Sequence, residues 1–120
     1  MIFFSLDTKE EYCNSEQFQP QCLKNEAILM RSATYGRMRI GRCILAEEVA
    51  AQRLIGDDAR ILGCSADVLS ILDRKCSGKS QCDIRTADVS YNNARPCFPG
   101  LVSYLEASYD CITCKHLFIV

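Results

Sequence analysis

The sequence predicts a small, disulfide-rich α+β domain in which antiparallel strands pack on one or two short helices. Its 120 residues fit one compact domain, and nine cysteines come close to the density of a disulfide scaffold. Stretches with the two-residue period of a strand flank stretches with helical spacing, and no internal repeat is present. These observations together favour a single mixed domain over a repeat array.

The first long strand is expected at residues 27–35, where the side chains alternate between two faces. One face carries Ile28, Met30, Ser32 and Thr34, and the other carries Leu29, Arg31, Ala33 and Tyr35. Gly36 is expected to end this strand.

Two helices are expected after it. Residues 44–55 are rich in Ala, Glu, Gln and Arg, and Gly56 is placed as a C-terminal stop. Residues 66–76 carry apolar side chains at helical spacing, with Ser65 as the N-cap and Asp67 in the first turn.

The remaining third of the chain is expected to hold two strands and a long loop. A short strand is predicted at residues 82–86, and turn-forming residues indicate a loop at 89–100. Residues 101–111 alternate as a strand with one mostly buried face.

Charge and cysteine content limit the partners and the cellular compartment that we expect for the domain. The net charge of −1 is spread without a basic stripe, so nucleic acid is not an expected partner. The cysteine content indicates an oxidising environment, and therefore an extracellular or cell-surface domain. Because residues 1–6 are apolar but lack the features of a secretory signal, we expect a piece of a longer protein or a chain whose signal has been removed.

Three segments together resemble the sea-urchin-egg-lectin (SUEL) family of rhamnose- and galactose-binding lectins, whose domains also occur in latrophilin-type receptors. The segments are Ala33-Thr34-Tyr35-Gly36-Arg37, the loop from Cys76 to Cys82, and the run from Pro96-Cys97 through Tyr104-Leu105-Glu106 to Tyr109-Asp110-Cys111. The resemblance implies a lectin domain over 12–114, an N-terminal extension over 1–11 and a C-terminal tail over 115–120.

The cysteines alone leave many connectivities open. The resemblance implies one of them: Cys13 with Cys43, Cys22 with Cys111, Cys64 with Cys97, and Cys76 with Cys82. Cys114 is then unpaired, and a Cys114–Cys114 bridge in a homodimer stands beside a thiol made surplus by excision of the domain.

The resemblance also implies where a sugar would bind. The candidate contacts are Asn14, Tyr35, Arg37, Asp88, Arg95, Gly100 and Ser103. Typical sugar binders have Glu, Asp and Lys where this chain has Asn14, Arg95 and Ser103. The loss of two carboxylates removes strong acceptors for sugar hydroxyls. Arg95 and Arg37, if adjacent, would suit an acidic sugar or a protein carboxylate.

Other motifs carry less weight. Cys111, Cys114 and His116 have half the spacing of a zinc site, but a second ligand pair is missing, so no metal or other cofactor is expected. His116 is the single histidine, which disfavours histidine-assisted catalysis, and we expect no enzyme. Tyr91, Phe98 and Tyr104 are candidates for a binding surface, with packing inside the domain the stronger alternative for Tyr104.

The sequence therefore favours an extracellular carbohydrate-recognition module, nominally for L-rhamnose- or D-galactose-type glycans. Its expected partner is a cell-surface glycan or glycoprotein. A protein-binding adhesion or accessory module on the same fold, without sugar binding, is the alternative, and a protein receptor is then the partner. Fold alone does not separate the two.

Overall fold

The computed structural model describes residues 3–4, 9–54, 58–92 and 95–113, and it confirms the expected α+β domain. Its centre is an antiparallel sheet with the strand order β1-β7-β4-β5, in which β2 also pairs with β7. These strands are β1 (Phe3–Phe4), β2 (Glu10–Tyr12), β4 (Glu26–Arg37), β5 (Cys64–Asp67) and β7 (Tyr104–Thr113). Residues 3–4 and 10–11 of the expected N-terminal extension thus pair with β7.

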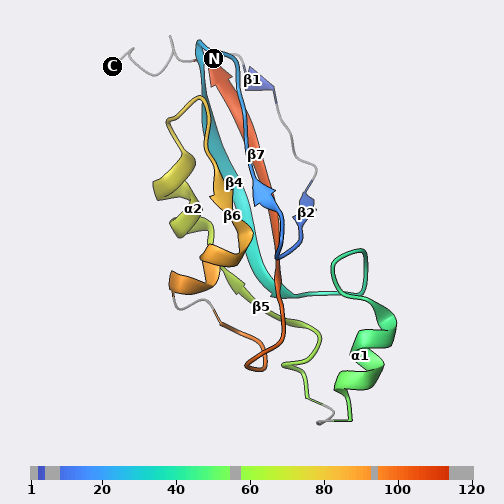
Figure 1. The fold of residues 1–120 in the computed structure, drawn as a ribbon. Helices are drawn as coiled ribbons and strands as arrows, with labels where there is room; N and C mark the ends of the chain where they lie inside the picture. The colour runs from blue at the N-terminus through green and yellow to red at the C-terminus, as the bar shows by residue number, and fades with distance from the viewer. Residues whose placement is uncertain (1–2, 5–8, 55–57, 93–94, 114–120) are drawn as a thin grey trace.

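The other elements lie around this sheet (Figure 1). A two-stranded sheet forms from β3 (Gln17–Phe18) and β6 (Ile84–Arg85), and a 3-10 helix, η1 (Thr86–Asn92), follows. Helix α2 (Leu69–Cys76) lies along β4, whereas α1 (Ala46–Gln52) lies beyond the end of β4 that is far from the N-terminus. No helix among the described residues is long and apolar enough to cross a membrane.

Two apolar clusters form the core. The larger lies between the central sheet, α2 and the β3–β6 pair, and its members include Phe18, Met30, Leu72, Ile84 and Leu105. The smaller joins α1 to the start of β7 through Ile44, Val49, Ile61 and Tyr104. Tyr104 is 1% exposed, so its packing role is confirmed.

Strand β4 departs from the predicted alternation because a β-bulge lies between Met30 and Ser32. The extra residue moves the later side chains to the opposite face, so Ala33 and Tyr35 join Met30 in the core. The strand also continues through Gly36 to Arg37 instead of ending at Gly36.

The second predicted helix begins later than expected. Residues 64–67 form β5, which pairs with the end of β4, so Ser65 is a strand residue and not the N-cap. The Asp67 carboxylate accepts a hydrogen bond of 2.9 Å from the Leu69 N–H and so satisfies a free donor at the start of α2. Tertiary pairing has overridden helical spacing here. Likewise, residues 89–92 of the expected loop belong to η1.

Four disulfides crosslink the chain: Cys13–Cys43, Cys22–Cys111, Cys64–Cys97 and Cys76–Cys82. This is the pairing that the resemblance implies. Cys22–Cys111 has the largest sequence separation, 89 residues, and joins the segment before β4 to β7. Gly56 and Cys114 lie outside the described residues, so the helix stop and the dimer stay predictions.

Gly36 is required where β4 and β5 come together. A Cβ at this position would lie 2.2 Å from the carbonyl oxygen of Cys64, closer than any real contact. We expect Gly36→Ala to lower the free energy of unfolding by about 2 kcal/mol or more, because the backbones must separate. Urea unfolding with intact disulfides measures this. Gly41→Ala, whose Cβ would be 3.5 Å from Glu11, is the control, and equal losses would contradict the prediction.

The disulfides should differ in how much they stabilise. In the chain-entropy model, closing 89 residues contributes about 4–5 kcal/mol and closing 6 contributes about 2 kcal/mol. We therefore expect the Cys22→Ala/Cys111→Ala double variant to lose more stability in urea than Cys76→Ala/Cys82→Ala. The comparison is demanding, since Cys76 is fully buried and its removal also costs packing. A larger loss in the second variant would refute the loop-entropy account.

Candidate functional site

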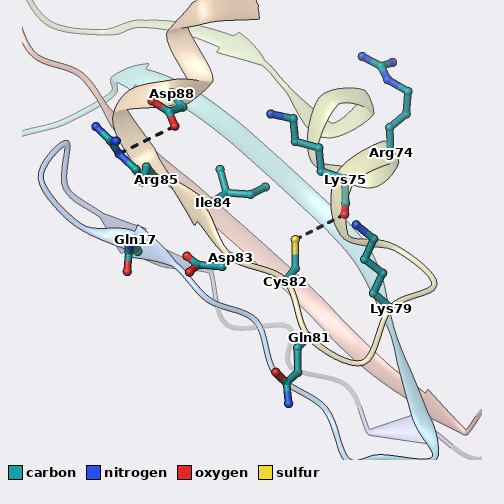
Figure 2. Close-up of a pocket in the computed structure, with 10 residues that line it drawn as sticks. All are labelled: Gln17, Arg74, Lys75, Lys79, Gln81, Cys82, Asp83, Ile84, Arg85 and Asp88. Atoms are coloured by element: carbon teal, nitrogen blue, oxygen red, sulfur yellow. Dashed lines mark hydrogen bonds and ion pairs between the residues drawn. The ribbon is translucent and has the colours of Figure 1, made fainter.

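Two hollows in the surface contain most of the candidate residues. The first, of about 680 Å³, lies beside α2 and β6, and we call it the Asp88 hollow (Figure 2). Its cations on α2 and the following loop are Arg74, Lys75 and Lys79. Arg85 and Asp88 lie across from them, with Arg85 Nε 3.9 Å from Asp88 Oδ2. Asp88 therefore lies in a mixed-charge hollow, apart from the pocket that holds most other candidates.

The second hollow has a volume of about 420 Å³, and we call it the Arg95 pocket. It is lined by one residue after Cys13, one residue of β4 and the segment from 95 to 103 that leads into β7. Five of the candidates lie together here: Asn14, Tyr35, Arg95, Gly100 and Ser103. Positions almost ninety residues apart in the chain thus converge on one pocket.

Arg37, an expected sugar contact, does not line the Arg95 pocket. Its side chain is fully buried, and Nε donates a hydrogen bond of 2.7 Å to the carbonyl oxygen of Ile61. Its other nitrogens donate to the carbonyl oxygen of Val102 and to the side chain of Gln52. Burial lowers the pKa of the Arg37 guanidinium. Because the buried Arg37 is absent from the lining of the Arg95 pocket, the two guanidinium groups do not form a joint anion site there.

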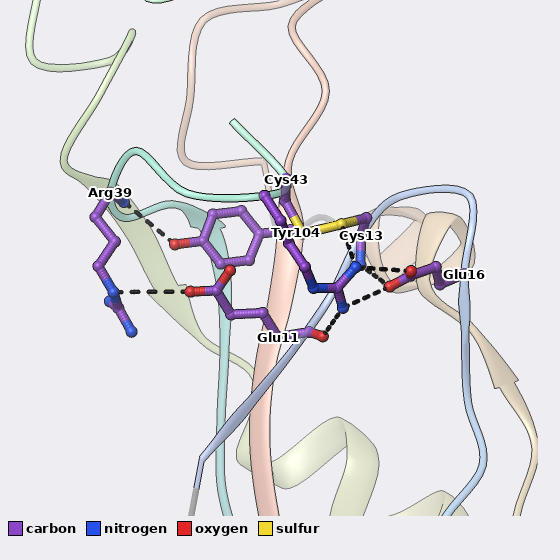
Figure 3. The surroundings of a disulfide bond; sticks show 7 residues. Glu11, Cys13, Glu16, Arg39, Cys43 and Tyr104 are labelled. Carbon is purple, nitrogen blue, oxygen red and sulfur yellow. Dashed lines mark hydrogen bonds and ion pairs between the residues drawn. A yellow bond between two sulfur atoms is a disulfide. The ribbon is translucent and has the colours of Figure 1, made fainter. Parts of the chain in front are cut away.

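Asn14 directly follows Cys13, whose disulfide with Cys43 is shown with its surroundings in Figure 3. The Glu16 carboxylate accepts a hydrogen bond of 2.7 Å from the Cys13 N–H and pairs with Arg42, whose Nη1 is 2.8 Å away. The Arg42 and Cys13 hydrogen bonds hold the pKa of Glu16 below its usual value. The turn that contains Asn14 is thus fixed by one covalent bond and one charged pair.

The segment that contains Arg95 is held in place by contacts of Cys97 and Phe98. Cys97 is joined to Cys64 at the start of β5, and the Phe98 N–H donates a hydrogen bond of 2.9 Å to the carbonyl oxygen of Arg60. The Arg60 guanidinium also lies over the Phe98 ring, 5.3 Å from its centroid. This cation–π contact orients an aromatic side chain that lines the pocket.

Phe98 is the pocket residue whose role the sequence left open. It was one of three aromatic candidates for a binding surface, and no spacing distinguished it from the others. The side chain of Tyr91 lies outside the described residues, and Tyr104 is in the core. An aromatic residue directly after a crosslinked cysteine in an irregular segment is the signal that marks Phe98.

The lining of the Arg95 pocket combines polar and apolar groups. Among the described residues that line it, Arg95 is the one charged side chain, and Asn14, Tyr35 and Ser103 supply the uncharged polar groups. Phe98, Pro99 and Leu101 supply apolar surface. Spaced donors and acceptors beside an aromatic ring suit a polyol with one apolar face, which is the chemistry of a sugar.

The described residues form one cluster with the spacing of a metal site: Cys22, Glu26 and Cys111. The two cysteines are bonded to each other, so neither offers a thiolate ligand. One oxygen of Glu26 accepts a hydrogen bond of 2.9 Å from the Leu23 N–H. The cluster is therefore explained as part of the fold.

Comparison with known proteins identifies the family of this domain. The model of the D-galactoside/L-rhamnose binding SUEL lectin domain matches residues 20–111, which is most of the chain. The chain belongs to the SUEL lectin family. This SUEL domain lies outside the cell, as its disulfides indicate, since such crosslinks persist in oxidising compartments.

Curated relatives include proteins of very different length. The SUEL domain is 32% identical to "Protein eva-1 homolog C" of Pan troglodytes over 83% of this chain, but it spans 21% of that protein. It is 28% identical to the "D-galactoside-specific lectin" of Heliocidaris crassispina, covering 86% of this chain and 89% of the lectin. It is 25% identical to "Adhesion G protein-coupled receptor L1" of Homo sapiens, of which it spans 7%.

The buried Arg37 network allows a direct test of its structural role. We expect Arg37→Met to lower the free energy of unfolding by about 2–4 kcal/mol, because the carbonyl oxygens of Ile61 and Val102 lose their donor. Urea unfolding measures the loss. Arg74→Met, an exposed position on α2, is the matched control and should change stability by less than about 0.5 kcal/mol. A similar small effect at Arg37 would disprove the role.

Proposed function

We propose that the SUEL domain is a carbohydrate-recognition module whose Arg95 pocket binds a galactose- or rhamnose-type unit of a cell-surface glycan. The observation that carries the proposal is the convergence of Asn14, Tyr35, Gly100 and Ser103 on one pocket. Its volume of about 420 Å³ lies within the range of small-molecule sites.

The chemistry of the lining supports binding rather than catalysis. Asn14 offers both donors and an acceptor, and Ser103 offers a hydroxyl, so each can hydrogen-bond a sugar hydroxyl. Phe98 offers an aromatic surface for the C–H face of a pyranose ring. Such a site orients a ligand by hydrogen bonds and packing.

Three departures from the residues of typical sugar binders favour a second candidate function. Asn14, Arg95 and Ser103 replace Glu, Asp and Lys, so the pocket lacks the charge-assisted acceptors of those proteins. Some relatives are named as adhesion receptors. The alternative is a protein-binding adhesion or accessory module in which the same surface contacts a receptor.

Titration with methyl galactoside and with L-rhamnose, followed by amide NMR, tests the proposal. We expect shifts confined to Asn14, Tyr35 and residues 97–103, because these line the pocket. Asn14→Ala and Ser103→Ala should each weaken binding about threefold to tenfold, the effect of one neutral hydrogen bond. Gln81→Ala, in the Asp88 hollow, is the control and should leave binding unchanged.

Two results would contradict sugar binding in the Arg95 pocket. One is the absence of shifts at saturating sugar while the domain still retains a cell-surface protein in a pull-down, which would favour the adhesion module. The other is a set of shifts around residues 74–88, which would move the site to the Asp88 hollow.

A further inference from the structure

We propose that the Arg95 pocket selects an acidic monosaccharide, with the sugar carboxylate paired to the Arg95 guanidinium. The proposal rests on sugar binding in this pocket and names the class of sugar. Its basis is the charge distribution of the lining, in which the Arg95 cation lies among uncharged groups.

Arg95 is exposed, and no carboxylate of the described residues forms an ion pair with it. A guanidinium has five donors and no acceptor, so it satisfies only the acceptor half of a neutral sugar hydroxyl. A carboxylate instead accepts two parallel hydrogen bonds from the guanidinium fork and carries the opposite charge. The group that uses Arg95 best is therefore an anion on the bound ring.

A second cation near the pocket, Arg60, already has an ion-pair partner. Arg60 Nη2 lies 2.9 Å from Asp58 Oδ2, and the Arg60 guanidinium is stacked on the Phe98 ring. The Arg60 guanidinium therefore already has an ion-pair partner and orients the Phe98 ring. Among the described residues that line the pocket, Arg95 is thus the cation that remains for a ligand, while Phe98 provides packing that does not depend on ligand charge.

The Asp88 hollow offers a contrast within the same molecule. It has more cations, Arg74, Lys75 and Lys79 among them, but it also contains Asp83 and Asp88. Those carboxylates repel an anion that approaches the same hollow. The lining of the Asp88 hollow is nevertheless net positive, with four cations against two carboxylates, so its cations serve as controls for general attraction between charges.

The test uses two ligands that differ at one carbon: methyl α-D-galactopyranoside and its C6 carboxylate, the methyl galactosiduronate. Affinities are measured by amide NMR titration at neutral pH and low salt. We expect the uronate to bind about tenfold more tightly, the gain of one charge-assisted bidentate pair in a solvent-exposed site. Raising the salt to about 0.5 M should reduce this advantage, because exposed charges are screened.

Variants assign the selectivity to Arg95. Arg95→Gln should abolish the advantage of the uronate, so that the two ligands bind with equal affinity, and Arg95→Lys should retain part of the advantage, since the charge stays but the fork is lost. Arg74→Gln, the same charge change in the Asp88 hollow, should have no effect. Phe98→Leu should weaken both ligands equally.

The outcomes separate the two proposals. Equal affinity for the two ligands, or an advantage that survives Arg95→Gln, overturns the acidic-sugar selectivity and leaves sugar binding in place. Absence of binding by either ligand overturns sugar binding itself and the selectivity with it. Tighter binding of the uronate that depends on Arg95 supports both.

Discussion

The pairing of β4 with β7 is the constraint on which the rest of this domain depends. It aligns Tyr35 with Leu105 and Gly36 with Tyr104, so the end of one strand meets the beginning of the other. On one face this pairing creates the surface that α2 and the β3–β6 pair cover. At its end it places Tyr35 beside the segment that leads into β7, which is where the Arg95 pocket lies.

The pocket walls are irregular segments, and covalent bonds and buried polar groups hold them in place. Residues 95–103 contain no helix or strand, so they lack the repeated backbone hydrogen bonds that would fix them. Cys64–Cys97 ties their start to β5, and Arg37 binds the carbonyl oxygen of Val102 near their end. The contacts that stabilise this end of the fold therefore also shape the Arg95 pocket.

The sequence named five residues that line the Arg95 pocket and two that do not, and the difference has a physical cause. Asn14, Arg95 and Ser103 lie within a few residues of crosslinked cysteines or the β7 strand, so the order of the cysteines locates them well. Arg37 was misplaced because the acceptors that bury it, such as the carbonyl oxygen of Ile61, come from segments that no local pattern connects to it. Asp88 was misplaced because η1 carries it toward β6, away from the pocket.

The sequence by itself determined the class of fold, the two longest strands and, through its resemblance to a family, the disulfide pairing. Those features follow from local periodicity and from the order of the cysteines, both of which are visible in the sequence. Only the tertiary structure decided the bulge in β4, the strand at residues 64–67 and the presence of Arg95 as the one charged side chain among the described residues that line its pocket. Each of these features depends on contacts between segments that are far apart in the sequence, and those contacts form only when the chain folds.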